Sequence, residues 1–246
     1  MRYFIFTDIH GNVEAMNTVL EFAESQEIDH YLFLGDMVGY GASPNKVMEK
    51  LQSLEPISLI RGNHDKAVCE LETIKSFNPI AASAILWTRD NINDKNKEFL
   101  TSIQTGPIRV EDKVTICHGA PFDEDFYIFG EFDAAEAFLH FETQLCFFGH
   151  THFPFIYTEK DHIVEGTFIS EDTNWVKLEK GARYLINPGS VGQPRDRNSK
   201  AACAVFDSTK NEMQFHRMEY DIGAAQDKII EAKLPQALAD RLALGI

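Results

Sequence analysis

An α/β fold is predicted for this chain of 246 residues, and three observations predict it. Short apolar runs alternate with amphipathic segments through the first two-thirds of the chain, which is typical of alternating strands and helices. Five of these runs end in a group of Gly, Asp, Asn or His residues. Hydrophobic residues make up 44% of the chain, enough apolar surface for one core. We therefore expect a single domain over residues 1–246.

The first two-thirds of the chain contains the predicted βα units. Strands are expected at 3–7, 31–34, 57–60, 114–117 and 145–148. Asn12 can cap the helix after the first strand, and Ser43-Pro44 opens a second helix that runs to Leu51. Further helices are expected at 79–92 and then through Leu100. This alternation predicts parallel strand pairing in the first half of the chain.

The last third of the chain has the pattern of short strands joined by turns. These strands are expected at 155–159, 162–170, 174–178, 184–186, 202–206 and 213–218. Residues 224–244 are expected to be helical, with a break at Pro235.

The charge excludes several classes of partner. The chain has 38 acidic and 23 basic residues, for a formal net charge of -15. Such a surface repels nucleic acid polymers and anionic membranes, and no apolar run is long enough to span a bilayer. The four cysteines are scattered and predict free thiols in the cytoplasm. A phosphorylated substrate would need strong local positive charge to overcome this field.

Polar residues that bind metals gather where five of the expected strands end. These groups are Asp8-Ile9-His10, Gly35-Asp36, Gly62-Asn63-His64-Asp65, His118-Gly119 and Gly149-His150-Thr151-His152. Five of the nine histidines lie in them. Because ligands bind at the carboxyl ends of strands in open α/β sheets, we expect the five groups to form one site.

The composition of these groups indicates bound metal. Crowded carboxylates, imidazoles and an amide remain unsatisfied without a cation. Mixed nitrogen and oxygen ligands suit Mn, Fe, Zn, Co or Ni better than Mg or Ca. The ligands exceed the needs of one ion, and two ions roughly 3.5–4 Å apart can clamp an in-line displacement. The sequence therefore favours phosphoester hydrolysis.

The ordered set D-x-H, G-D, G-N-H-D, H-G and G-H-T-H resembles the calcineurin-like metallophosphoesterase superfamily. The resemblance spans Asp8 to His152 and extends into the stretch 187–195. The segment from Gly35 to Asn45 is similar to the small prokaryotic branch of predicted phosphoesterases and diadenosine-tetraphosphatase-like proteins. This resemblance implies a four-layer α-β-β-α sandwich, with two mixed sheets flanked by helices.

The resemblance also implies the role of each residue. Asp8, His10 and His152 would hold one divalent transition metal, Asn63, His118 and His150 would hold the other, and Asp36 would bridge both. Mn or Fe is expected before Zn, Co or Ni. A metal-bridging hydroxide would attack phosphorus. His64, placed and kept protonated by Asp65, would be the catalytic partner of the metals.

Several substrates and two other functions remain open at this stage. Nucleotides or dinucleoside polyphosphates come first, then phosphomonoesters and phosphodiesters. A protein Ser/Thr phosphatase is less favoured, because Gly39-Tyr40-Gly41 and Asp65 depart from that family's pattern. The alternatives are a non-catalytic scaffold of the same fold and a regulatory nucleotide-binding protein.

Three surrounding features have both a functional and a plain structural interpretation. Arg195 could bind a substrate phosphate or pair with Asp196. Tyr40 could contact substrate or only pack. The aromatic residues of the loop 121–129 could stack on a nucleobase or tuck against the body of the protein. The sequence does not decide whether the protein forms a homo-oligomer.

Overall fold

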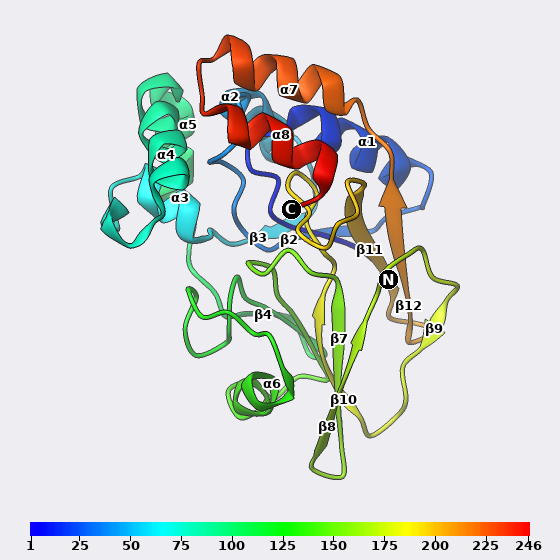
Figure 1. The fold of residues 1–246 in the computed structure, drawn as a ribbon. Helices are drawn as coiled ribbons and strands as arrows, with labels where there is room; N and C mark the ends of the chain where they lie inside the picture. Colours follow the sequence, from blue (N-terminus) through cyan, green and yellow to red (C-terminus); the bar gives the residue numbers. More distant parts are fainter.

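The computed structural model describes all 246 residues and contains two six-stranded sheets (Figure 1). The first sheet has the order β3 (Ile57–Leu59), β2 (His30–Phe33), β1 (Arg2–Phe6), β11 (Ala201–Asp207), β12 (Glu212–Met218), β9 (Val176–Lys177). The second has the order β4 (Ile108–Glu111), β5 (Val114–Ile116), β6 (Leu145–Phe147), β10 (Arg183–Asn187), β7 (Phe155–Lys160), β8 (Ile163–Phe168).

Both sheets are mixed. Strands β1, β2 and β3 pair in parallel, as do β5, β6 and β10, whereas β11 runs antiparallel to β1 with Phe4 opposite Val205. The parallel pairing predicted for the first half is confirmed. Because β1 and β11 are neighbours, residues from both ends of the chain build the same sheet. The single-domain prediction is compatible with this arrangement.

Helices cover the outer faces of the two sheets. Helices α1 (Val13–Glu24), α2 (Pro44–Gln52), α7 (Ile222–Glu231) and α8 (Gln236–Leu244) lie on the first sheet, and α6 (Glu131–Phe138) lies on the second (Figure 1). The remaining helices are α3 (Asn63–Val68), η1 (Ile74–Ser76), α4 (Pro79–Asn91) and α5 (Asp94–Ser102). None of the helices is long and apolar enough to cross a membrane.

Three hydrophobic clusters fill the spaces between these layers. One joins the first sheet to its helices, a second of 19 buried residues lies between the sheets, and a third joins the second sheet to α6. Along β1 the side chains alternate between clusters: Phe4 packs toward the helices and Ile5 toward the other sheet. This alternation follows from the period of two in a strand. The expected four-layer sandwich is confirmed.

Helix starts follow the capping residues in the sequence. The side chain of Asn12 accepts from the backbone N–H of Ala15, and Asn78 and Asn93 cap α4 and α5 in the same way. The break predicted at Pro235 separates α7 from α8.

Four elements are absent from the sequence prediction: α3, η1, α6 and β4. The G-N-H-D group follows β3, as expected, and it also begins α3. There Asp65 stabilises the first turn by accepting from the N–H of Gly62 at 2.9 Å. Helix α6 and strand β4 are short, so their apolar periodicity is weak, and tertiary packing stabilises them.

Candidate metal centre and active site

The site lies where strands of both sheets end at their carboxyl termini. Asp8 and His10 follow β1, Asp36 follows β2, and Asn63 follows β3 in the first sheet. His118 follows β5, and His150 and His152 follow β6 in the second sheet. The structure thus brings all seven predicted metal ligands together at one edge of the sandwich, as the sequence predicts.

The backbone at these positions turns sharply. Five of the seven predicted ligands adopt the left-handed region, with φ of 54° at Asp8, 49° at His10, 57° at Asp36, and 64° at both His150 and His152. This conformation is uncommon outside glycine and concentrates at functional sites. Its effect is to turn each side chain from the end of a strand toward the common centre.

A first donor group contains Asp8, His10 and His152. The Nε2 atoms of the two histidines lie 3.1 Å apart, and Asp8 Oδ1 lies 3.3 Å from Nε2 of His152. All three side chains are buried. Three donor atoms in one small space form a candidate metal position.

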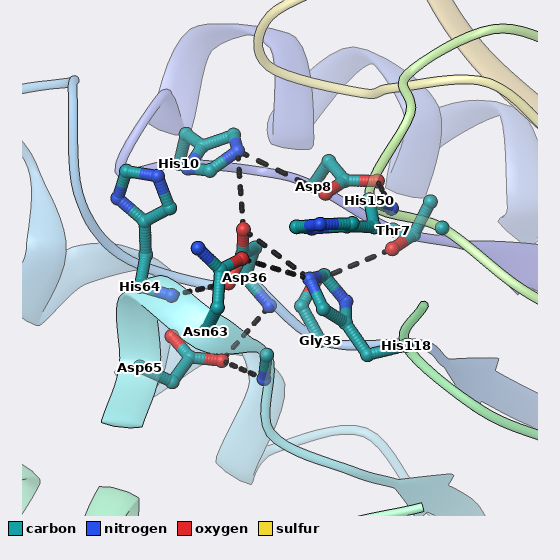
Figure 2. Close-up of polar contacts among 12 residues, drawn as sticks. Thr7, Asp8, His10, Gly35, Asp36, Asn63, His64, Asp65, His118 and His150 are labelled. Carbon is teal, nitrogen blue, oxygen red and sulfur yellow. Dashed lines mark hydrogen bonds and ion pairs between the residues drawn. The ribbon is translucent and has the colours of Figure 1, made fainter. Parts of the chain in front are cut away.

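A second donor group contains Asp36, His118 and His150, with Asn63 beside it. Asp36 Oδ2 lies 3.4 Å from Nε2 of His118, and Asn63 Oδ1 lies 3.2 Å from the same nitrogen. Asp36 Oδ2 also lies 3.6 Å from Nε2 of His10, in the first group. Figure 2 shows this carboxylate between the two groups, which is the position predicted for a bridging ligand.

The four ligand histidines share one pattern of hydrogen bonds. In each, one ring nitrogen donates to a main-chain carbonyl at 2.5–3.1 Å, and the other faces the donor groups. The carbonyls are those of Val38 for His10, Leu34 for His118, Asp125 for His150 and Gln193 for His152. Such a bond fixes the tautomer and leaves the second nitrogen free to bind a metal.

The donor groups fit divalent cations. The Oδ1 atom of Asp8 is buried without a hydrogen-bond partner. Burial and the charge of Asp36 raise the pKa of Asp8 to about 7. Burial would lower the pKa of His118, but the charge of Asp36 raises it to about 10, so this position favours a positive charge. Two cations would satisfy these carboxylates and the free histidine nitrogens.

His64 differs from the ligand histidines. Its Nδ1 has no hydrogen-bond partner, its ring packs beside Tyr40 with centroids 4.5 Å apart, and it borders an open cleft. His64 could complete a third donor group with His10 and Asp36, but both of those residues already belong to the other groups. We therefore place His64 on the substrate side of the site.

The expectation that Asp65 holds and protonates His64 is wrong. The carboxylate of Asp65 accepts from the backbone N–H groups of Gly62, Asp36, Met37 and Val38. The side chains of Asp65 and His64 point away from each other (Figure 2). Burial lowers the pKa of His64 to about 4, despite the opposing charge of Asp36. Asp65 is thus a positioning residue for the turn that carries Asp36, and burial favours the neutral form of the His64 imidazole.

Arg195 and Tyr40 lie at the site as a contacting pair. Nη2 of Arg195 lies 3.4 Å from the hydroxyl of Tyr40, and Tyr40 packs on His10 with ring centroids 4.7 Å apart. The alternative partner for Arg195 is excluded, because Asp196 forms an ion pair with Arg217. Arg195 has no carboxylate partner.

The cleft beside the metal centre has a volume of about 220 Å³. Tyr127 lines it, 41% exposed, with its ring 3.9 Å from that of His150 and stacked on Phe129 at 5.5 Å. Phe122 and Phe126 instead pack against the body of the protein. The packing interpretation thus holds for Phe122 and Phe126, and Tyr127 is the ring of this loop that stays exposed at the cleft.

Sequence reasoning missed two charged residues near the site. Lys66 forms ion pairs with Asp125, Glu124 and Glu72 at the rim of the cleft. Arg241 of α8 lies over the ring of Tyr40. The position of Lys66 directly after the G-N-H-D group could have placed it near the site from the sequence. Nothing in the sequence around Arg241 indicates that it lies at the site.

Two mixed sheets between helical layers, with a buried pair of nitrogen and oxygen donor groups at their common edge, define the metallophosphoesterase class. The calcineurin-like phosphoesterase superfamily domain matches residues 1–211. The chain belongs to this superfamily.

Individual relatives agree with this assignment. The chain is 38% identical to an uncharacterized protein of Methanocaldococcus jannaschii, over 98% of this chain and 97% of that protein. It is 35% identical to a metallophosphoesterase from Sphaerobacter thermophilus, with a TM-score of 0.87 over 100% of this chain and 99% of that one. A hypothetical protein from Pyrococcus horikoshii OT3 has the same fold, at 19% identity and a TM-score of 0.80 over 100% of this chain and 98% of the other.

Proposed function

We propose that this protein is a metal-dependent phosphoesterase that hydrolyses a small phosphate ester or anhydride, with nucleotides and dinucleoside polyphosphates as the favoured substrates. The observation that carries the proposal is the pair of buried donor groups joined by Asp36. Such a pair suits two divalent ions, and Mn or Fe is our first choice among them.

The residues divide the work as follows. Asp8, His10 and His152 would hold one ion, Asn63, His118 and His150 the other, and Asp36 both. Bound ions supply positive charge to the phosphoryl oxygens and increase the acidity of the attacking water. This local charge offsets the net charge of -15 that would otherwise repel a phosphate.

His64 acts from the cleft in its neutral form. A neutral imidazole donates one N–H and accepts at its other nitrogen. His64 can therefore donate to a phosphoryl or leaving-group oxygen, and the main-chain N–H of the same residue, which donates to Asp36 Oδ1 at 2.9 Å, fixes its place. Arg195 orients the phosphate from the side of Tyr40.

The cleft supports the preference for nucleotides. Tyr127 offers an exposed ring beside the metal centre, and the flat face of a nucleobase can stack on such a ring. The chain's net charge of -15 repels nucleic acid polymers and anionic membranes. We therefore expect neither a nucleic acid polymer nor a membrane as partner, and we leave a homo-oligomer open.

The cysteines support a cytoplasmic location. All four are buried and free, and Cys117 lies 3.6 Å from Cys146, sulfur to sulfur, without a disulfide. Scattered cysteines without a paired spacing suit a reducing compartment.

The test is hydrolysis by protein stripped with a chelator and reloaded separately with Mn, Fe(II), Zn, Co or Ni. The substrates are a chromogenic phosphomonoester, a chromogenic phosphodiester and diadenosine tetraphosphate. We expect metal to restore turnover, and His64→Ala and Asp36→Asn to lower kcat by 100-fold or more, about 2.7 kcal/mol. The control variants His140→Ala and Asp90→Asn change exposed residues far from the donor groups and should keep full activity.

Two results would overturn this function. Protein that binds no metal would remove its basis. Protein that binds two ions but hydrolyses none of the three substrates would favour the scaffold alternative.

A further inference from the structure

The C-terminal helix α8 reaches the active site, although it lies outside the part of the chain that matches the superfamily. The match ends at residue 211, and α8 spans Gln236–Leu244. In Figure 1 the end of α8 lies against the loop near residues 190–200. The backbone N–H of Arg197 donates to the carbonyl of Gly245 at 2.7 Å, which joins the two segments.

The docking of α8 on this loop places the guanidinium groups of Arg195 and Arg241 against the side chain of Tyr40. Cζ of Arg241 lies 5.5 Å from the centroid of the Tyr40 ring, and Nη2 of Arg195 lies 3.4 Å from the Tyr40 hydroxyl. Nε of Arg241 donates to the main-chain oxygen of Ile246 at 2.5 Å, which fixes the guanidinium beside Tyr40. We call Arg195 and Arg241 the arginine pair.

No Asp or Glu side chain neutralises the arginine pair. Neither side chain has an Asp or Glu oxygen within 4.0 Å, in a chain with 38 acidic residues, whereas the nearby Arg217 is neutralised by Asp196. Burial lowers the pKa of Arg241, and the charge of Arg195 lowers it further. Two half-buried cations that repel each other form a site for an anion.

The position of the pair relative to the metal centre indicates which anion. The ring of Tyr40 contacts the rings of His10 and His64, with centroids 4.7 and 4.5 Å away, and Arg241 lies over the same Tyr40 ring. Arg241 is therefore farther from Asp36 than His64 is, and its anion is not the phosphoryl group held between the metals. A phosphate one step along a chain would fit.

We propose that the arginine pair binds a second phosphate of the substrate, so that the protein acts on a phosphate chain such as a nucleoside or dinucleoside polyphosphate rather than on a lone phosphate. This inference rests on the proposed function for the reacting phosphate. It assigns to α8 a role in specificity: Arg241 selects the substrate and does not take part in the bond-breaking step.

The kinetic test compares a substrate with a phosphate chain to one without it. Arg241→Gln should raise KM for diadenosine tetraphosphate by about 10- to 100-fold, because a charged hydrogen bond is lost. The same variant should leave KM for a chromogenic phosphodiester within about twofold, and Arg241→Lys should recover part of the loss. Arg109→Gln removes one exposed charge elsewhere on the surface and is the matched control.

The binding test does not depend on turnover. Inorganic tripolyphosphate and orthophosphate are titrated calorimetrically into wild type and Arg241→Gln, both loaded with the same metal. Tripolyphosphate should bind wild type at least tenfold more tightly than orthophosphate, and the variant should lose this difference. Chelation of metal by tripolyphosphate is the same for both proteins, so it cancels in the comparison.

The outcomes separate the two proposals. If wild type hydrolyses nothing but Arg241 is needed to bind tripolyphosphate, the enzyme function fails and the arginine pair stands. If hydrolysis occurs but Arg241→Gln behaves as wild type in both tests, the arginine pair is wrong. An equal loss for both substrates, with a lowered melting temperature, would assign Arg241 a structural role and also overturn the proposal.

Discussion

Asp65 determines the shape of the candidate metal centre, although its carboxylate faces the backbone and not the donor groups. Its two oxygens accept four backbone N–H groups at 2.8–3.2 Å, three of them from the turn Asp36-Met37-Val38. Val38 in turn accepts from Nδ1 of His10 at 3.1 Å. One buried carboxylate thus positions a ligand from β2 and, through a carbonyl, a ligand that follows β1.

Asp65→Asn should therefore lower both stability and metal affinity. An amide has one acceptor oxygen and turns its NH₂ toward backbone donors, so at least one buried N–H remains unsatisfied. We expect a loss of about 2–4 kcal/mol in the free energy of unfolding and at least a tenfold weaker metal affinity. Urea denaturation and metal titration measure these two quantities.

Asp90→Asn is the matched control for this prediction. Asp90 is exposed in the last turn of α4 and has no hydrogen bond or ion pair, so its variant should stay within about 0.5 kcal/mol of wild type. If Asp65→Asn is as stable as Asp90→Asn and binds metal normally, the positioning role of Asp65 is refuted.

Tyr127 should matter only for substrates that carry a base. Tyr127→Ala removes the exposed ring beside His150, and a base stacked on such a ring contributes about 1–3 kcal/mol. We expect KM for diadenosine tetraphosphate to rise by about 5- to 100-fold, whereas the Kd of inorganic tripolyphosphate stays constant. Steady-state kinetics measures the first quantity and calorimetric titration measures the second.

Two further variants complete the Tyr127 experiment. Tyr127→Phe keeps the ring and should retain wild-type KM. Phe132→Ala removes a ring that is 95% exposed on α6 and should have no effect. Equal changes in the KM for diadenosine tetraphosphate and the Kd of tripolyphosphate would show that Tyr127 shapes the cleft rather than stacking on a base.

Among the structural elements, the loop between β10 and β11 packs against the residues that follow β1 and against His152, and so forms one wall of the site. The backbone N–H of Gly192 donates to the carbonyl of Asp8 at 3.0 Å, and the carbonyl of Gln193 holds His152. The two backbones come so close at Gly192 that a Cβ atom there would overlap the carbonyl oxygen of Ile9. Only glycine permits this approach.

Gly192→Ala should push this loop away from the residues after β1. Because backbone atoms on both sides would have to move, we expect a loss of about 3 kcal/mol or more in unfolding free energy, together with weaker metal binding. Gly130→Ala is the control, since a Cβ atom at Gly130 meets nothing within 4 Å and should change stability by less than about 1 kcal/mol. Chemical denaturation measures the stability of both variants. Similar stabilities would disprove the close approach of Gly192 to the carbonyl of Ile9.

The sequence predicts elements best where the signal is local. Asn12, Asn78 and Asn93 mark helix starts, and the caps are present in the structure. Pairing of β1 with β11 has no local signal, because it depends on packing between segments about 200 residues apart. The same reason explains the missing β4, an edge strand that only β5 stabilises.

The candidate site divides in the same way. The convergence of the candidate metal ligands could be predicted because each follows a strand, and parallel strands bring such positions to one edge. The role of Asp65 could not, because its partners are backbone groups of another loop. Arg241 could not either, since only the docking of α8 onto the loop near Arg197 brings it to Tyr40.

At the scale of the whole molecule, the excess of negative charge makes the stability of the fold depend on bound metal ions. The chain carries a net charge of -15, and two carboxylates, Asp8 and Asp36, are fully buried at the metal centre. The surface cannot compensate these buried charges, and the arginine pair lies on only one side of them. Bound cations would therefore be part of the folded structure, as well as of the chemistry.

Removing the metal should lower the melting temperature by about 5–10 °C. A ligand that binds only the folded state at 100 times its Kd adds about 2.7 kcal/mol, and in a chain of this length each kcal/mol shifts Tm by about 2–4 °C. The measurement is thermal unfolding of chelator-treated protein before and after addition of Mn. KCl at equal ionic strength should not reproduce the shift, because it screens surface charge without binding the donor groups.

Asp36→Asn, which removes the ligand common to both groups, should lose most of the metal-dependent shift whatever its stability without metal. A shift that persists in Asp36→Asn would mean that the cations bind elsewhere on the acidic surface and not at this site.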